Sequence, residues 1–359
     1  MLKYALQGLT LICWVQNTLR RQSAEAVAMG AHRSVFYDQI WRDAAAHEGC
    51  TFTPLGFDIA EVRRGDRSIR VTLNFSPLDD SVTLRLAGHK PTVYKILADE
   101  GVPVPRHIAI NCFDLKAARA FLRSSTRPVV VKPASGTGGG AGVTTNITDT
   151  WRLMRALAQA RSFGGVALIE EQIEGNNYRL LYLDGEMIDA VERKPPSITG
   201  DGTSSIGTLV RRENALRVKT GPSLAQALLH IDVDMRHSLE AQGKSLRTVP
   251  AKGEIVRVKT VINGNRAEEN EPAFAQICES TVAMGRRVVE RLGIRLAGVD
   301  IITSNPGIDL ANSGGVVIDV NTTPGHYYHY LKKGHEFQVA IAILRAALGE
   351  TYEAKAASR

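Results

Sequence analysis

Residues 129–143, VVVKPASGTGGGAGV, are the stretch that decides the fold of this chain. A β-branched run carries Lys132 near its end and leads into a loop with five glycines among residues 135–142. Residues 143–147 then have the composition of a second strand, so the stretch predicts a glycine-rich hairpin. Glycine backbone can close over an anion with its N–H groups pointing inward, and a lysine adds positive charge. The hairpin therefore predicts a site for a polyphosphate.

Two familiar phosphate-binding patterns fit this loop poorly. The spacing Gly136-x-Gly138-x-x-Ala141 nominally matches a dinucleotide fingerprint, but that fingerprint opens a helix and this loop opens a strand. A Walker A loop would end in Gly-Lys-Ser/Thr, and no such ending is present. A plain glycine-rich turn is the alternative, and Lys132 directly before the loop favours phosphate binding over it.

Length and composition place the chain among ordinary globular proteins. Its 359 residues are enough for two or three subdomains, and 23% charged with 44% hydrophobic residues argues against disorder. The net charge of +7 would suit an anionic ligand, although basic excess is often only a solubility feature. Aromatic residues make up 6% and are not interleaved with Arg or Lys, so nucleic-acid binding is not favoured.

Cysteine usage and one apolar segment bear on the cellular setting. Four scattered cysteines without CxxC spacing indicate neither a zinc site nor a disulfide framework, and a reducing cytoplasm fits them. Residues 4–15 are apolar, but a membrane span needs about 20 such residues. We therefore expect a buried helix or strand there, no membrane partner and a cytoplasmic location.

Local patterns predict several elements. Residues 1–86 have the pattern of an α/β unit, with a helix over 35–47 and a hairpin formed by 59–62 and 69–73. Residues 150–161 are predicted as an amphipathic helix, and Asp184-Gly185 is a strong signal for a hairpin turn. A short helix is expected over 206–214, and residues 215–250 are predicted as helical and polar without a site.

Two apolar strands near the end of the chain carry acidic residues. Asp300 lies within one β-branched run, and Asp319 and Asn321 lie within another. Residues two apart on a strand leave the same face, so the side chains of Asp319 and Asn321 should point together. A carboxylate in an apolar strand is costly unless it is paired or binds a cation. Oxygen donors of this kind favour a hard cation such as Mg²⁺, which shares its ligands with phosphates.

Taken in order, these motifs resemble the ATP-grasp superfamily, and within it the ATP-grasp part of cyanophycin synthetases. The resemblance covers residues 86–329. It is carried by the helix around Lys90 and Lys95 with GVPVP at 101–105, VVVKP with its glycine loop, EEQIEGNNYR at 170–179, RKPP at 193–196, TGDG at 199–202, AGVDI at 297–301 and VIDVNTTPG at 317–325.

The resemblance implies an α+β/α/β chain with an ATP-grasp fold, in which two α+β subdomains clamp a nucleotide behind a small N-terminal α/β domain. The implied domains are residues 1–86 on the substrate side, the ATP-grasp domain at 87–345 with a lid subdomain at about 128–172, and a C-terminal tail at 346–359. The chain ends near residue 359 and lacks the Mur-ligase-like second half of a cyanophycin synthetase. We therefore do not expect it to make the full two-amino-acid polymer unit alone.

The resemblance also implies roles for individual residues. Residues expected to bind ATP are Lys90, Lys132, Ser135, Gly136, Gly138, Gly139, Gly140, Glu170, Glu171, Gln172, Ile173 and Asn177. Within this set, the lysines would contact phosphates, Glu170 with the backbone of 171–173 the adenine edge, and Asn177 the ribose. Residues expected to be catalytic are Lys259, Asn263 and Arg193, and those expected to bind metal are Asp300, Asp319 and Asn321.

The activity implied is ATP-dependent carboxylate–amine ligation through an acylphosphate, with ATP and Mg²⁺ or Mn²⁺, two ions in all. The substrates would be amino acids or short peptides, and a homodimer is expected by analogy. Two alternatives stay open: an enzyme that modifies a peptide or protein, by adding residues or closing lactams, and a nucleotide-binding protein without catalysis. The family's Ser/Thr-Gly-Gly stretch is replaced here by residues 265–269, so substrate identity does not carry over.

Overall fold

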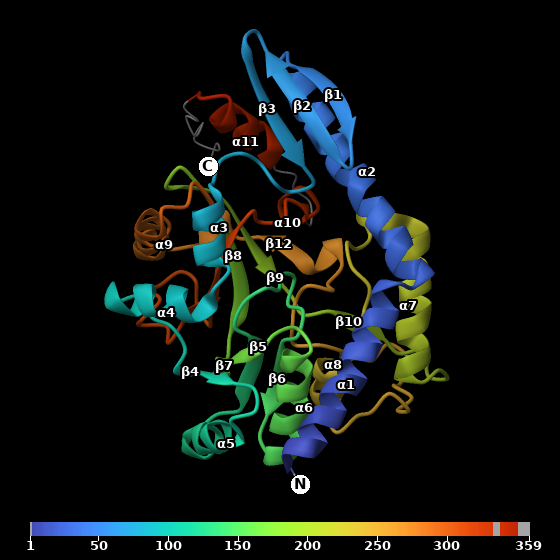
Figure 1. Ribbon diagram of the computed structural model, residues 1–359. Helices are drawn as coiled ribbons and strands as arrows, with labels where there is room; N and C mark the ends of the chain where they lie inside the picture. Colours follow the sequence, from blue (N-terminus) through green and yellow to red (C-terminus); the bar gives the residue numbers. More distant parts are fainter. Residues whose placement is uncertain (1, 333–337, 351–359) are drawn as a thin grey trace.

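The computed structural model describes residues 2–332 and 338–350 (Figure 1). Its centre holds two sheets, one of five strands in the order β12-β9-β8-β13-β14 and one of four in the order β4-β7-β5-β6. A three-stranded sheet, β1-β2-β3, and a two-stranded sheet, β10-β11, lie outside them. Every ladder among the described strands is antiparallel. The expected mixture of helices with sheets is confirmed.

The bounds of the elements are as follows. The strands are β1 (Thr51–Gly56), β2 (Ile59–Arg64), β3 (Arg67–Thr72), β4 (His107–Asn111), β5 (Val129–Pro133), β6 (Thr144–Ile147), β7 (Val166–Glu171), β8 (Asn176–Leu183), β9 (Glu186–Arg193), β10 (Ser197–Thr199), β11 (Ile255–Arg257), β12 (Asn270–Pro272), β13 (Leu296–Thr303) and β14 (Val316–Thr322). The α-helices are α1 (Leu2–Arg21), α2 (Ala24–His47), α3 (Ser81–Ala87), α4 (Lys90–Asp99), α5 (Leu115–Ser124), α6 (Thr150–Arg161), α7 (Ile206–Thr220), α8 (Val233–Glu240), α9 (Glu279–Leu292), α10 (Tyr327–Tyr330) and α11 (Val339–Ala347). Three single-turn 3₁₀ helices are η1 (Gly221–Ser223), η2 (Ala267–Glu269) and η3 (Phe274–Gln276).

The five-stranded sheet is covered by helices on both faces. Side chains alternate along a strand, so Leu180 and Tyr182 of β8 leave one face while Leu181 and Leu183 leave the other. The first pair packs in a core with residues of α4 and α9. The second pair packs in a separate core with residues of α2 and α11. Because both faces are covered, the strands are apolar throughout their central parts.

The four-stranded sheet has only one face buried in an apolar core. Val129 and Val131 of β5 pack against residues of α1, α5 and α6. The residues between them and after them, Val130 and Lys132, leave the opposite face and line a cavity. The predicted hairpin is confirmed, since β6 returns antiparallel to β5 after the glycine loop. This alternation turns Lys132 away from the core and toward the other sheet.

Helix α1 corrects the expectation of a buried element over residues 4–15. The segment is helical, but its outer face is exposed over its whole length, with Tyr4 77% and Leu11 62% accessible. Only Leu6 and Cys13 of this helix are buried, on the face that contacts α6. The sequence misled because α1 is apolar around most of its circumference, and one face alone finds a partner in the described chain.

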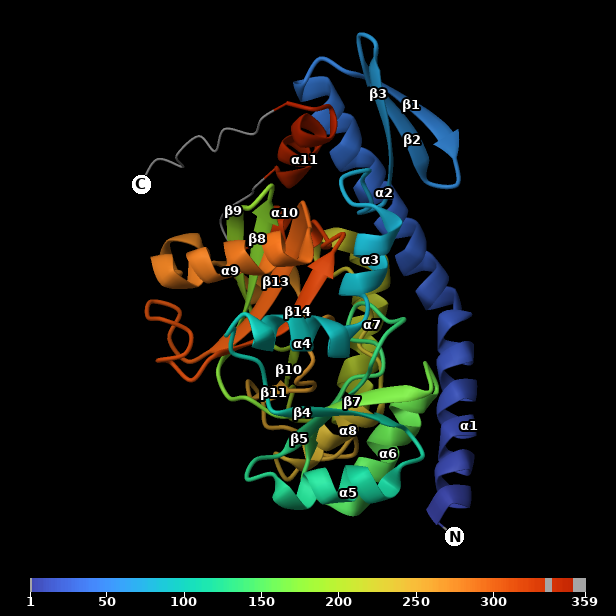
Figure 2. The same ribbon diagram turned by 60° about the vertical axis from the view of Figure 1, so that its left-hand side comes forward.

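The N-terminal residues divide between two parts of the molecule. Helix α1 runs beside α6 at the four-stranded sheet, whereas α2 contacts α7 and α11 near the five-stranded sheet (Figure 2). The hairpin of β2 and β3 is confirmed, with Arg64 opposite Arg67 at its turn. The helix expected over 35–47 is also present, as the second half of the longer α2.

The stretch from 206 to 250 departs most from its prediction. The helix expected over 206–214 continues to Thr220, and most of 221–250 consists of turns, apart from η1 and α8. Asp232 and Asp234 lie at the start of α8, where Asp232 accepts from the N–H of Met235 as the helix cap. Asp234 accepts from both the N–H and the hydroxyl of Thr145 on β6. Asp234 thus attaches α8 to the glycine hairpin, which a pattern of polar residues does not reveal.

His326 forms the contact between the end of β14 and α2. Its side chain is completely buried, with Tyr37 and Trp41 edge-on at 5.5 Å and 5.6 Å between ring centroids. Neither ring nitrogen has a hydrogen-bond partner among the described residues. Burial, with a smaller contribution from His329, lowers the pKa of His326 to about 3. The ring is therefore neutral at physiological pH.

We expect His326 to make the fold less stable as the pH falls from 6.5 toward 4. Between these values the unfolded chain binds a proton that the native ring does not, so the free energy of unfolding falls by about 1.4 kcal/mol per pH unit. Urea unfolding of His326→Gln at pH 7 and pH 5 should show a smaller pH dependence than the unaltered protein. His47→Gln, on the exposed end of α2, is the control. An identical pH dependence in His326→Gln would contradict this account.

Candidate functional site

A cavity of about 340 Å³ lies between the five-stranded and four-stranded sheets. Both sheets, the glycine loop and α4 contribute to its walls. The sequence-predicted site residues that line it are Lys90, Lys132, Gly138, Gly139, Gly140, Glu170, Glu171, Gln172, Ile173, Asn177, Arg193, Asn263, Asp300, Asp319 and Asn321. Ser135, Gly136 and Lys259 are the three predicted residues that do not line it.

Lys132 and Glu170 form a buried ion pair on the four-stranded sheet. Lys132 Nζ lies 2.8 Å from Glu170 Oε2, and both side chains are about 7% exposed. Lys132 also donates to the carbonyl oxygen of Ile318 on β14, 3.2 Å away. The Tyr94 hydroxyl completes the cluster, at 2.9 Å from Glu170 Oε2 and 2.7 Å from the same Ile318 carbonyl. The ammonium of Lys132 is thereby held between the two sheets.

Asp300 sits between two guanidinium groups on the five-stranded sheet. Arg179 binds both of its carboxylate oxygens, with Nη2 at 2.7 Å from Oδ2, and Arg193 Nη2 lies 2.9 Å from Oδ1. Arg193 also donates from Nε to Asn177 Oδ1 at 2.9 Å. Burial alone would raise the pKa of Asp300, but the charges of both arginines outweigh it and the pKa lies below its ordinary value.

Asp319 and Asn321 stand opposite Asp300 on the neighbouring strand. Asp300 of β13 pairs directly with Asp319 of β14, and Gly298 pairs with Asn321. Lys90 belongs to the N-terminal turn of α4, and its Nζ donates to Asp319 Oδ1 at 2.6 Å. Asn321 Nδ2 lies 3.3 Å from Asp300 Oδ2, so the amide oxygen of Asn321 points away from Asp300. Two carboxylates and an amide thus gather on one face, as the strand spacing predicts.

A cation in this cavity would have to be held by a mixed set of side chains, two carboxylates and one amide. No group of three or more His, Cys, Asp or Glu side chains suited to a metal occurs in residues 2–332 and 338–350. The candidate donors for a cation are oxygens of Asp300, Asp319 and Asn321. In this structure, however, Asp300 is bound by Arg179 and Arg193, and Asp319 by Lys90. Oxygen donors fit a hard divalent cation better than a soft one.

The glycine loop lies against the turn segment that carries Asn263. A Cβ atom at Gly140 would lie 2.4 Å from Asn263 Nδ2 and 2.5 Å from Val261 Cγ1, and its φ of +69° also favours glycine. At Gly138, by contrast, a Cβ would meet no atom within 4 Å. The loop therefore approaches Asn263 more closely than any side chain at position 140 would allow.

The segment 171–173 has one backbone donor still available. The N–H of Glu171 donates to the Arg106 carbonyl, and the N–H of Gln172 donates to the Pro128 carbonyl. Within the part of the chain that the structure describes, the N–H of Ile173 has no such partner. It lines the cavity at the end of β7.

The two predicted catalytic residues of the 259–263 segment point to different places. Asn263 lines the cavity between the sheets and accepts from the Tyr328 hydroxyl at 3.4 Å. Lys259 instead pairs with Asp232 at 2.5 Å and lines a second cavity behind the glycine loop. The segment consists of bends and a turn, and Asn263 lines the second cavity as well, whereas Lys259 lines that cavity alone.

Tyr94, Tyr328 and the ion-pair partner of Arg179 escaped prediction from the sequence. Tyr94 lies four residues after Lys90 on α4, so helical spacing could have indicated it. Arg179 faces Asp300 directly across the β8–β13 ladder, a pairing that only the sheet topology reveals. Tyr328 packs its ring against the Arg193 guanidinium, 5.4 Å from the ring centroid, and gives no signal in the sequence.

In this protein, two antiparallel sheets with helices packed against them enclose a cationic cavity, and a glycine hairpin closes it. This is the architecture of the ATP-grasp fold. Structural comparison agrees with this class. A bifunctional glutathione synthetase from Pasteurella multocida superposes with a TM-score of 0.51 at 20% sequence identity, over 84% of this chain and 41% of that one. No family model matches the sequence.

Sequence comparison finds cyanophycin synthetases. The protein from Trichormus variabilis is 30% identical over 249 residues, and that from Synechocystis sp. is 30% identical over 264 residues, or 68% and 72% of this chain. A glutathione biosynthesis bifunctional protein from Desulfotalea psychrophila is 25% identical over 270 residues, which are 74% of this chain and 34% of that protein. This chain belongs to the ATP-grasp superfamily. The match covers only 27% of the Trichormus protein and 30% of the Synechocystis one.

Asp300→Asn should destabilise the fold strongly, because it leaves two buried guanidinium groups facing a neutral side chain. Breaking a buried ion pair in this way costs about 3–5 kcal/mol, which urea unfolding at pH 7 would measure. Asp184→Asn provides the matched control, since Asp184 binds Arg295 with both oxygens in an exposed pair. That change should cost at most about 1 kcal/mol. Equal losses in the two variants would show that the Asp300 cluster is not a buried charge network.

Proposed function

We propose that this protein is an ATP-dependent carboxylate–amine ligase that forms an amide bond through an acylphosphate. The observation that carries the proposal is the cavity between the sheets, where lysines, arginines, a glycine hairpin and a set of oxygen donors meet. Each of these parts has a use in phosphoryl transfer, and none of them is a nucleophile or a general base. The resemblance to amide-forming ATP-grasp proteins supports the same chemistry.

The cationic side chains would bind the phosphates of ATP. Lys90 and Lys132 both line the cavity, and each is paired with one carboxylate, Asp319 or Glu170. An ammonium group has three donors, so Lys90 has donors left for phosphate oxygens. At Lys132 a phosphate oxygen would replace one of the existing partners, which are Glu170, the Tyr94 hydroxyl and the Ile318 carbonyl. The N–H groups of Gly138, Gly139 and Gly140 would cover the phosphates from the loop side.

The other end of the cavity suits the base and ribose. Ile173 offers the N–H that is left without a partner in the described structure, and a ring nitrogen of adenine would accept from it. Glu170 would act mainly by holding Lys132 in place and less by contacting the adenine base, because its carboxylate is already bound by Lys132 and Tyr94. Asn177 gives its oxygen to Arg193, so its amide N–H₂ would be the group directed to a ribose hydroxyl.

Asp300, Asp319 and Asn321 would hold divalent cations at the phosphate end. Mg²⁺ or Mn²⁺ bound there would neutralise charge on the phosphate oxygens. The oxygen donors on this face fit such ions, and two ions would match the number that the resemblance implies. Arg179 and Arg193 keep Asp300 ionised, and a cation would have to replace at least one of their contacts to reach its oxygens.

The reaction would proceed in two displacements. A substrate carboxylate oxygen attacks the γ-phosphorus, the bond to the bridging oxygen breaks, and ADP leaves from an acylphosphate. An amine then attacks the acyl carbon, phosphate leaves, and the amine loses a proton to give the amide. Asn263 and Arg193 stand where they would stabilise the phosphoryl oxygens. Closing the glycine loop would exclude the water that hydrolyses an acylphosphate.

The setting of this activity belongs to the same proposal. We infer that the substrates are amino acids or short peptides and that the enzyme works in the cytoplasm as a homodimer. Free thiols at Cys13, Cys50, Cys112 and Cys278 support a reducing compartment. None of the described helices combines the length and apolarity that crossing a bilayer requires.

A screen for ADP release over amino acids and short peptides, with and without Mg²⁺, tests the proposal. We expect ADP and phosphate only when a carboxylate, an amine and the metal are all present. Lys132→Ala should reduce this release by about 10²–10³-fold, because it removes a charge from the phosphate end. Lys95→Ala, which breaks an exposed pair with Asp99 on the same helix as Lys90, should leave the rate unchanged. Full turnover by Lys132→Ala, with an unchanged melting temperature, would rule out this role.

Gly140→Ala should slow ADP release by about a hundredfold, because the added methyl group meets Asn263 and Val261 and prevents the loop from closing. Its circular dichroism spectrum should stay unchanged, since the loop lies outside every core cluster. Gly138→Ala adds the same methyl group where it meets nothing, and its rate should stay within about threefold of the original. Equal rates for the two variants would contradict a closing role for the loop.

A further inference from the structure

Helix α1 carries an apolar face that no other element covers in residues 2–332 and 338–350. The large side chains of this face are Tyr4, Leu11, Ile12, Trp14, Val15 and Leu19. Their exposed fractions range from 41% for Val15 to 77% for Tyr4. Figure 2 shows α1 along an outer edge of the molecule, with α6 on its inner side. The face is therefore accessible to a partner along the whole helix.

The exposed residues of α1 are spaced as in a helix that pairs with a second helix. Positions 5, 8, 12, 15 and 19 are all exposed and follow one another in steps of three and four. This spacing places them in one seam along the helix, as at the a and d positions of a coiled coil. We call these residues, Ala5, Gly8, Ile12, Val15 and Leu19, the α1 seam. A Cβ atom at Gly8 would meet nothing within 4 Å, so a second backbone has room to approach there.

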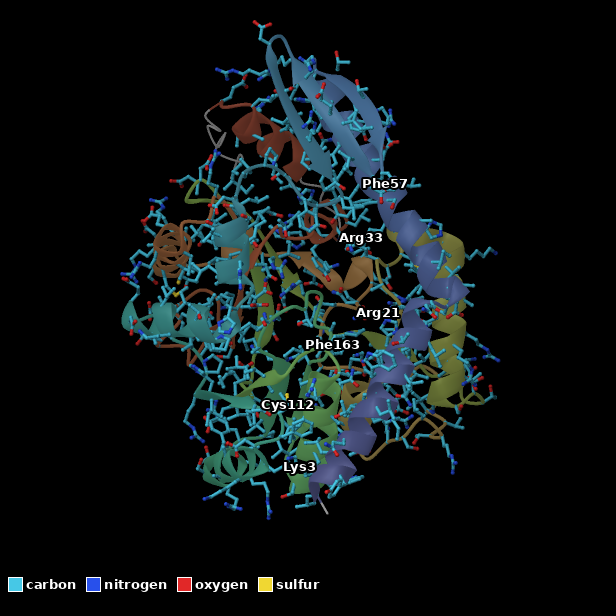
Figure 3. All side chains as sticks on the ribbon, viewed as in Figure 1. Lys3, Arg21, Arg33, Phe57, Cys112 and Phe163 are labelled. Atoms are coloured by element: carbon cyan, nitrogen blue, oxygen red, sulfur yellow. The ribbon has the colours of Figure 1, made fainter. Side chains whose placement is uncertain are left out.

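The α1 seam can be covered without burying a charge. Between Lys3 and Arg20 the helix contains no charged residue, and Lys3 and Arg21 lie toward its two ends (Figure 3). Thr18, beside the seam, already donates its hydroxyl to the Trp14 carbonyl oxygen at 2.9 Å. Burial of an unpaired charge would oppose association, whereas long basic side chains at the ends of a contact can still reach water.

A protein helix fits this face better than a lipid surface does. Helices that lie on membranes carry many Lys and Arg side chains on the face opposite their apolar one. The opposite face of α1 instead holds Leu6 and Cys13, which are buried in the core of the four-stranded sheet with residues of α6. The basic residues of α1 lie only near its ends. The helix therefore lacks the basic face that anionic headgroups would bind.

The area of the exposed face matches one side of a stable homodimer. A large aromatic side chain has about 150–250 Å² of surface and an aliphatic one somewhat less, so the exposed parts of the large side chains on α1 present on the order of 600 Å². A stable interface covers about 800 Å² on each partner, and in homodimers about 65% of that area is apolar. One α1 face thus supplies the apolar area that one copy needs. Monomeric proteins rarely expose so large a contiguous patch.

We propose that a second copy of this chain docks on α1, with the two α1 seams packed against each other across a twofold axis. The same surface then serves both copies, as in most homodimers. Since α1 belongs to the core of the four-stranded sheet, the contact would join the two sheets that carry the glycine loops. This inference rests on the homodimer included in the proposed function and names its surface.

Leu11→Glu and Val15→Glu test this interface by sedimentation equilibrium at about 10 μM protein. We expect the unaltered protein to have twice the mass of one chain. Each variant should have the mass of a single chain, with the dissociation constant raised at least about a hundredfold, because a carboxylate would be buried in the contact. Val82→Glu is the matched control, since it adds the same charge at an exposed valine on α3, and it should stay dimeric. Unchanged melting temperatures would show that the variants fold.

A monomeric unaltered protein at about 100 μM would overturn the inference, as would variants of α1 that dissociate no more easily than Val82→Glu. Sedimentation of the monomer with phosphatidylserine vesicles, lost in Leu11→Glu, would also overturn it, since a lipid surface would then be the occupant. ADP release separates the interface from the ligase function. Release by a monomeric protein would keep the ligase and reject the interface, whereas a dimer without release would keep the interface and reject the ligase.

Discussion

The Lys132–Glu170 ion pair, with the Tyr94 hydroxyl, is the interaction on which the rest of the site depends. Lys132 and Tyr94 both bind the carbonyl of Ile318, which belongs to the opposite sheet. A single β14 carbonyl thus joins the four-stranded sheet, the five-stranded sheet and α4. Because each member is buried, the loss of one would leave another polar group without a partner at considerable cost. The width of the cavity follows from this connection.

Charge pairing explains how a cavity with so many cations can exist in the folded protein. Lys90 is paired with Asp319, Lys132 with Glu170, and Arg179 and Arg193 share Asp300. A buried pair gives little net stability, because desolvation of both ions offsets their attraction. Pairs of this kind are better understood as prepared binding groups, in which an anionic ligand replaces or extends interactions that already exist.

The parts of the fold that depend on local chemistry could be predicted from the sequence. The glycine hairpin, helix α6 and the β8–β9 turn at Asp184-Gly185 follow from strand composition, helical period and turn residues. The exposed face of α1 and the turns after Thr220 could not be predicted in this way. Each depends on which residues from distant parts of the sequence pack against the segment. The alternation of β5 explains why Lys132 faces the cavity, whereas the orientation of Lys259 depends on Asp232, 27 residues earlier in the chain. The sequence offers Arg179 either as a binder of a carboxylate or acylphosphate or as part of a structural ion pair, but its pairing with Asp300 requires the β8–β13 register.

The central claim is that a carboxylate oxygen passes to phosphate by way of an acylphosphate in this cavity. The most direct test uses amino acids labelled with ¹⁸O in their carboxyl groups, incubated with ATP, Mg²⁺ and the protein. Mass spectrometry of the released phosphate should show one ¹⁸O atom per phosphate, with ADP as the nucleotide product. Unlabelled phosphate, or AMP with pyrophosphate in place of ADP, would contradict the account.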